Sequence, residues 1–101
     1  MKKTILTLIM TTLAASPTMA IEYFDEIKYC RKLTEAANSG YSFESSCRER
    51  ELKAKRELHA RAIPSEIVQY CTELTISADS GNSFLKSCIE REMKAKKSLG
   101  Y

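Results

Sequence analysis

The sequence repeats itself with an offset of 41 residues. The pattern YCxxLTxxAxSGxSFxxSCxERExKAKxxL runs from Tyr29 to Leu58 and again from Tyr70 to Leu99. From Ile27 to Leu58, 18 of 32 residues are identical to their partners in the second copy. Agreement on this scale at a fixed period indicates an internal duplication, in which each copy is one structural unit. Whatever one copy forms, the other is expected to form as well.

Each copy is predicted to be a helical hairpin, because apolar residues recur at helical spacing on both sides of a short polar break. The breaks contain Gly40 and Gly81, which are expected to take the left-handed conformation that ends a helix. Ser42 and Ser83 are then expected to act as N-caps of the second helix in each copy. Pro64 is expected to separate the two hairpins. The predicted apolar stripes are Ile27, Cys30, Leu33 and Ala37, then Phe43, Cys47, Ala54 and Leu58, and their partners in the second copy.

The four cysteines fit this hairpin geometry. Cys30 and Cys47 are centred on the first break, and Cys71 and Cys88 on the second, so each pair is expected to form a disulfide within its own hairpin. Pairing Cys30 with Cys71 and Cys47 with Cys88 is an alternative if equivalent helices lie side by side, and a nested pairing through Cys47 and Cys71 fits worst. The pairs are too widely spaced for a structural zinc site, so no metal and no cofactor is predicted.

The predicted fold class is therefore all-α, with two tandem disulfide-stapled helical hairpins forming a small four-helix arrangement. A single domain is expected over residues 21–101, made of two repeats at about 23–62 and 64–101. A chain this small buries little apolar surface, which explains why it would need two staples.

Residues 1–20 are predicted to be a signal peptide. Two lysines precede an uncharged apolar run, and small residues follow, so cleavage is expected after Ala20, with Ala15 as the alternative site. The apolar run is too short for a stable membrane anchor, although a buried N-terminal helix is the competing interpretation. Removing residues 1–20 leaves 14 basic and 13 acidic residues, a net charge of +1 that disfavours nucleic-acid binding. The predicted location is periplasmic or secreted.

Two sets of residues are candidates for a partner surface. The repeated ERExKAK block has the spacing of a solvated helix face with Glu–Lys pairs, or it is a charged recognition face around Arg50 and Arg91. A second set is the apolar ridge formed by Leu85, Ile89 and Met93, which the first copy replaces with Glu44, Arg48 and Leu52. This ridge either packs the two hairpins together or binds a partner or a second copy.

No catalytic residue is predicted. The one histidine, His59, has no acid and nucleophile assigned to it by spacing, and it is expected to be a solvated residue near a helix end. The carboxylates of Glu49 and Glu51 point in different directions on a helix and cannot share a scissile bond.

The repeat YCxxLTxxAxSGxSFxxSCxERE is similar to repeats in small exported bacterial and phage proteins with no assigned activity, and this resemblance implies an envelope location. The expected function is a non-enzymatic binding or inhibitor protein that acts on another envelope or secreted protein, for example in immunity, lytic-enzyme inhibition or phage exclusion. A self-associating envelope-stress or structural protein, acting as a homo-oligomer, is the alternative, and a small hydrolase is less favoured.

Overall fold

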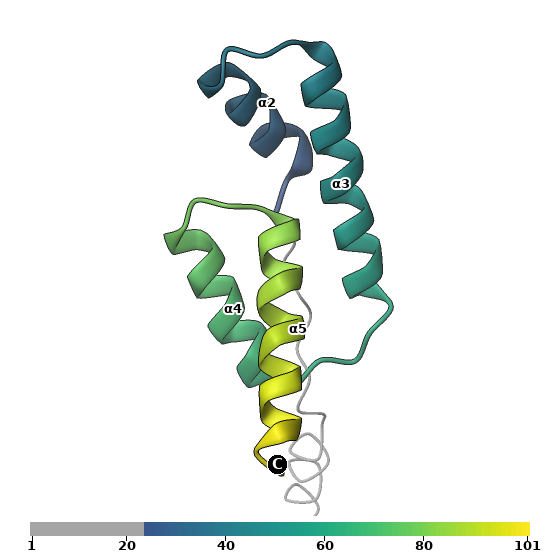
Figure 1. Cartoon of the computed structure of the whole chain (residues 1–101), viewed down its shortest axis with the longest axis vertical. Coiled ribbons are helices and arrows are strands. Elements are labelled where there is room, and N and C mark those ends of the chain that lie inside the picture. The colour runs from purple at the N-terminus through teal and green to yellow at the C-terminus, as the bar shows by residue number, and fades with distance from the viewer. Residues whose placement is uncertain (1–23) are drawn as a thin grey trace, which may run out of the picture.

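The structure, a computed structural model, describes residues 24–101. Over this range the helices are α2 (Glu26–Ala36), α3 (Tyr41–His59), α4 (Ser65–Ser77) and α5 (Asn82–Ser98). Helices α2 and α3 form hairpin 1, and α4 and α5 form hairpin 2 (Figure 1). The predicted all-α fold of two tandem hairpins is confirmed. The predicted signal peptide and its cleavage after Ala20 or Ala15 lie outside the described residues.

Each hairpin is closed by its own disulfide. Cys30 is bonded to Cys47 and Cys71 to Cys88, with Cα–Cα distances of 5.8 and 5.6 Å. All four cysteines are buried, and each bond joins the short helix to the long helix of the same hairpin. The predicted pairing is therefore confirmed, and the pairings between hairpins are excluded.

The turns differ from the prediction in which residue takes the left-handed conformation. Asn38 and Asp79, each with φ of 52°, occupy that region, while Gly40 and Gly81 have negative φ angles of −104° and −132°. Asn and Asp tolerate this backbone because their short polar side chains can hydrogen-bond locally. Helices α2 and α4 therefore end at Ala36 and Ser77, four residues before Gly40 and Gly81.

The predicted serine caps are also wrong. Helices α3 and α5 begin directly after Gly40 and Gly81, which are their N-caps and provide no side-chain hydrogen bond. Ser42 and Ser83 consequently lie inside the first turn. Among the helices of residues 24–101, only α2 has an N-cap residue with a side-chain hydrogen bond: the carboxylate of Asp25 accepts from two backbone N–H groups in the first turn.

The two long helices form the centre of the molecule. Helix α3 packs against α5, and each carries its own short helix, α2 and α4 respectively. Hairpin 2 is displaced along the long axis, so that the start of α5 lies below α2 and beside the second half of α3 (Figure 1). The arrangement is therefore two staggered hairpins rather than two hairpins side by side at equal height.

The main core lies in hairpin 2 and where α3 meets α5. Leu85 and Ile89 of the apolar ridge have no exposed surface, and they belong to one buried cluster with Leu58 at the end of α3. Met93 is partly buried against the same cluster. A partner surface at Leu85 and Ile89 is therefore excluded, because the ridge packs the hairpins together. The remaining members of the cluster are Ile63, Ile67, Val68, Cys71 and Cys88, with Phe24 and Leu74 packed against it.

Candidate binding surfaces

The junction between the hairpins is built around the first turn of α5. The Glu51 side chain, on α3, is 2% exposed and accepts a hydrogen bond from the backbone N–H of Ser83 at 3.2 Å. A carboxylate at a helix N-terminus satisfies a backbone N–H that has no partner within the helix and interacts favourably with the helix dipole. Hairpin 1 thus supplies the cap that hairpin 2 lacks.

Two further contacts fix this junction. A Cβ atom added to Gly81 would lie 2.4 Å from Glu51 Oε1 and 3.0 Å from the ring of Tyr29, so a larger residue there would displace the Glu51 carboxylate. The fully buried Asn82 side chain accepts a hydrogen bond from the N–H of Phe24 at 2.9 Å and donates one to its carbonyl at 3.0 Å. The start of α5 is therefore held tightly against hairpin 1.

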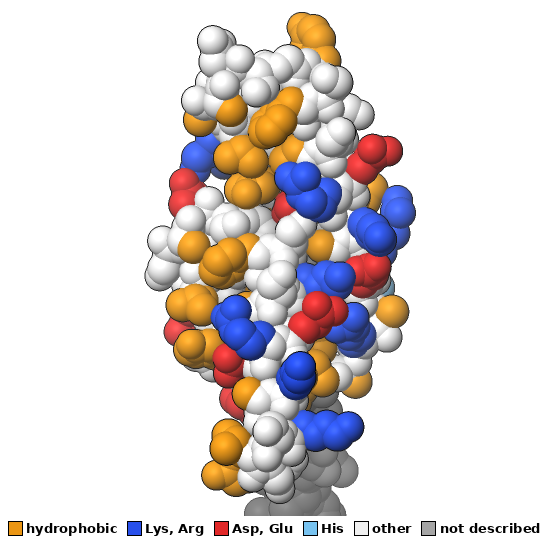
Figure 2. All heavy atoms as spheres, in the orientation of Figure 1, with side chains coloured by type: hydrophobic (Ala, Val, Ile, Leu, Met, Phe, Trp, Pro, Cys, Tyr) orange, Lys and Arg blue, Asp and Glu red, His pale blue; other side chains and the backbone are white. Residues whose placement is uncertain are grey.

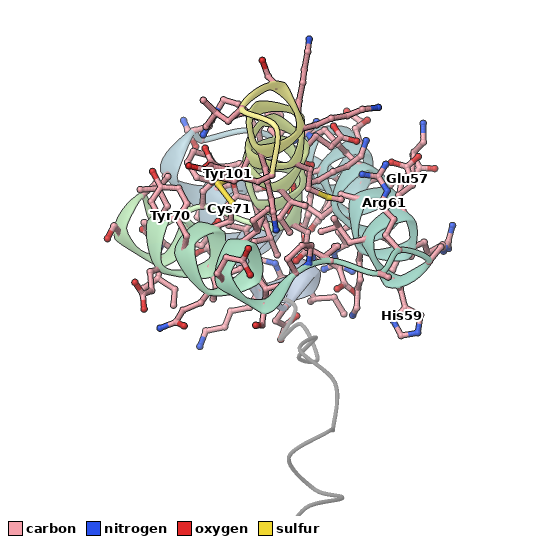
Figure 3. All side chains as sticks on the ribbon, turned by 90° about the horizontal axis from the view of Figure 1, so that it is seen from below. Glu57, His59, Arg61, Tyr70, Cys71 and Tyr101 are labelled. Atoms are coloured by element: carbon pink, nitrogen blue, oxygen red, sulfur yellow. A yellow bond between two sulfur atoms is a disulfide. The ribbon has the colours of Figure 1, made fainter. Side chains whose placement is uncertain are left out.

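An open groove lies between α4 and α5 at the opposite end of hairpin 2. This α4–α5 groove has a volume of about 530 Å³. Leu99 and Tyr101 on its edge are 72% and 85% exposed, and Figure 3 views the molecule from this end. The residues that line the groove are Glu66, Ile67, Glu92, Ala95, Lys96, Leu99 and Tyr101. It combines apolar walls with carboxylates.

A second groove lies between α2 and α3 in hairpin 1. This α2–α3 groove has a volume of about 490 Å³, with apolar walls at Ile27 and Leu52 and with Tyr41, which is 92% exposed. Glu44 lies in it and pairs with Arg48 and, at 3.1 Å, with Arg31. The remaining residues that line the groove are Glu26, Ser45 and Glu49.

The Glu44 network is ionised. The hydrogen bond from Arg31 lowers the pKa of the Glu44 carboxyl, the bond from Arg48 acts in the same direction, and desolvation opposes both. The hydrogen bond to Glu44 in turn raises the pKa of Arg31. At Glu44 and Arg48 the α2–α3 groove therefore carries charges where hairpin 2 carries Leu85 and Ile89.

Charged side chains of both signs gather along α3 and α5 (Figure 2). Lys86 bonds to Glu57 at 2.6 Å, and this contact lowers the pKa of Glu57 and raises that of Lys86. Glu90 lies 3.8 Å from Lys86 and 2.9 Å from Arg61. The Lys86–Glu57 and Arg61–Glu90 pairs join α3 and the segment that follows it to hairpin 2 at the surface.

Of the two predicted recognition arginines, Arg50 lines a small pocket of about 210 Å³ between α3 and α5, together with Lys53 and Lys86. Arg91 is exposed on α5.

Two lysines of the ERExKAK blocks reach across to the short helix of their own hairpin: Lys55 bonds to Glu26 at 3.4 Å and Lys96 to Glu66 at 3.0 Å. The sequence pattern suggested pairs within one helix and gave no signal for these cross-helix bonds.

His59 is the last residue of α3 and is exposed, on the α3 side of the view in Figure 3. Among residues 24–101, no group of three or more His, Cys, Asp or Glu side chains is placed to hold a metal ion. In the same part of the chain, no helix combines the length and apolar character needed to cross a bilayer.

Comparison with known proteins gives no relative: no protein-family model, curated protein or solved structure matches the chain. The two disulfides are typical of an oxidising extracellular or periplasmic environment.

Proposed function

We propose that this protein is a small periplasmic or secreted binding protein, exported by a cleaved signal peptide, that inhibits or blocks another envelope or secreted protein and catalyses no reaction of its own. Its hairpins are held by disulfides, so little conformational entropy is lost when a rigid surface docks on a partner.

The observation that carries this proposal is the exposure of large apolar side chains at both grooves. Tyr41 and Ile27 border the α2–α3 groove, and Leu99 and Tyr101 border the α4–α5 groove; all are at least half exposed. Aromatic and aliphatic side chains grouped around a groove with a few charges are typical of protein-binding sites. Two such grooves on a domain this small favour binding of another protein.

Self-association is the alternative function. It would require one copy to present an apolar face to the groove of the next copy. The face of hairpin 1 that corresponds to the ridge carries Glu44 and Arg48. The Arg48 side chain is still 36% exposed, and burying its charge in an apolar interface is costly, which favours a different protein as partner.

The test is capture of a partner by the oxidised protein from a periplasmic and envelope extract, identified by mass spectrometry. The matched control is the same protein reduced and alkylated at its four cysteines. A single stoichiometric partner bound only by the oxidised protein is the expected result. Capture of nothing, or only of a second copy, would contradict the proposal, and turnover in a broad hydrolase screen would contradict its non-enzymatic part.

A further inference from the structure

Hairpin 2 repeats the surface on which it is itself docked. In hairpin 1, this surface consists of Glu51, Ala54 and Leu58 on α3, which are 2%, 4% and 0% exposed because hairpin 2 covers them. The corresponding residues on α5, 41 positions later, are Glu92, Ala95 and Leu99. These three residues line the open α4–α5 groove, and Leu99 is 72% exposed.

The Glu–Ala–Leu surface is thus present twice. Hairpin 2 covers the copy on α3, whereas the copy on α5 lines an open groove. The covered copy shows what such a surface binds. Its occupant is the first half of α5, a helix whose N-cap is Gly81 and which donates the Ser83 backbone N–H to Glu51. That helix places Leu85 and Ile89, four and eight residues after the glycine, in one buried cluster with Leu58.

We propose that the α4–α5 groove is a docking site for the N-terminal end of a helix in the partner protein. This helix begins at a glycine and carries aliphatic residues four and eight positions later, as α5 does. The inference rests on the proposed binding function and identifies the surface and the partner chemistry for it.

The charges in the groove fit the start of a helix. Glu92 occupies the position of Glu51, which in hairpin 1 accepts a first-turn N–H, so its carboxylate is available for the partner helix in the same way. The first backbone N–H groups of a helix lack partners within the helix and carry partial positive charge. The other groove carboxylate, Glu66, is already paired with Lys96.

A second copy of this chain is a poor occupant. In the described part of the chain, the only other helix that begins after the repeated glycine is α3, which begins after Gly40. Four and eight residues after that glycine it carries Glu44 and Arg48, which are paired with each other. The helix α5 has the required residues, but they are buried in its own molecule. The groove therefore favours a helix from a different protein.

The test uses a labelled peptide as the probe, because the partner is unidentified. The peptide spans residues 81–96 and carries Cys88→Ser. Its binding to the oxidised protein is measured by fluorescence anisotropy and mapped by NMR. The control peptide also carries Leu85→Glu and Ile89→Arg, the charge pattern of hairpin 1. We expect the first peptide to shift the Ala95 and Leu99 resonances, and the control peptide to bind at least about tenfold more weakly.

Protein variants localise the effect. Leu99→Arg is expected to weaken peptide binding at least about tenfold, and Glu92→Gln about threefold, because they remove an apolar contact and the helix-capping carboxylate. Ile76→Arg is the matched control: Ile76 is 62% exposed and does not line the groove. It should bind the peptide as the wild type does. All three positions are partly or largely exposed, so the helical circular dichroism spectrum should stay unchanged.

The proposal is overturned if Leu99→Arg binds like the wild type, or if the shifts map to Ala54 and Leu58, which would mean that the peptide displaces α5. If the oxidised protein captures an envelope partner that Leu99→Arg captures equally well, the binding function stands and this docking site is wrong. If no partner is captured at all, the binding function itself fails.

Discussion

The Glu51 carboxylate on α3 accepts the backbone N–H of Ser83 on α5, a contact between residues 32 positions apart that joins the two repeats. Its counterpart in the second repeat, Glu92, lines an open groove. The duplicated sequence therefore places one residue type in two environments, and the difference between them can be measured.

Glu51→Ala should lower the free energy of unfolding by about 1–3 kcal/mol, because it leaves a partly buried backbone donor unpaired. Glu92→Ala is the matched control and should change it by no more than about 0.5 kcal/mol. Chemical denaturation followed by circular dichroism measures both. Equal effects of the two substitutions would contradict the capping role of Glu51.

The two turn glycines should respond differently to substitution. Gly81→Ala should destabilise the protein by about 1–3 kcal/mol, because the new Cβ would lie 2.4 Å from Glu51 Oε1 and the junction would have to open. Gly40→Ala meets no atom within 4 Å and should cost only about 0.5 kcal/mol, the effect of a weaker N-cap. Thermal melting of both variants tests this, and an unchanged melting temperature for Gly81→Ala would show that the hairpins are not closely packed there.

Removal of either disulfide should cost about 3 kcal/mol by the chain-entropy estimate, since each bond joins residues 17 positions apart. The paired substitutions Cys30→Ser with Cys47→Ser, and Cys71→Ser with Cys88→Ser, test the staples separately. Full reduction should unfold or loosen the protein. A melting curve that is the same with and without excess reductant would refute a stabilising role for the staples.

Acid should lower the stability of the protein by protonating Glu44 in the α2–α3 groove. The Arg31 hydrogen bond lowers the pKa of Glu44 in the folded protein below its ordinary value of 4.5. The stabilisation is therefore fully present above that value and is lost as the pH falls through the lower folded value. Glu44→Gln should flatten the loss of stability in this acid range. High salt should reduce the difference between variant and wild type, because Arg31 and Arg48 are partly exposed and salt screens their attraction to Glu44. Identical acid curves for the two proteins would contradict the assignment.

Introducing the apolar ridge of hairpin 2 into hairpin 1 should cause self-association. The double variant Glu44→Leu with Arg48→Ile gives α3 the aliphatic spacing of α5 and should let it enter the α4–α5 groove of another copy. Light scattering should then show a mean mass that rises with concentration more steeply than for the wild type. Adding Leu99→Arg should reverse the effect. A double variant that behaves like the wild type would weaken the view that Glu44 and Arg48 prevent head-to-tail assembly.

The repeat predicted the helices, the position of both turns and both disulfides, because these follow from local spacing within one copy. The turn details failed because Asn38 and Asp79 compete with the neighbouring glycines for the left-handed position. The sequence pattern could not show which apolar residues are buried. Ile27 on a predicted stripe is 51% exposed, whereas Thr34 is buried with its hydroxyl donating to the Cys30 carbonyl.

The binding surfaces depend on the stagger between hairpins, which no local pattern encodes. Leu58 and Leu99 are identical in the alignment of the two copies, yet one has no exposed surface and the other is 72% exposed. The difference between Glu44 in the first copy and Leu85 in the second did indicate that the second copy packs through this face. Only the three-dimensional arrangement shows that the matching surface of hairpin 2 stays open.

Both disulfides join cysteines that follow one another along the chain. An oxidase that links cysteines in the order in which they become available therefore forms the native pairs directly. No wrong bond has to be broken and exchanged through a mixed disulfide. The protein should mature wherever an oxidant is present, without an isomerase, and a chain with further copies of the unit would keep the same property.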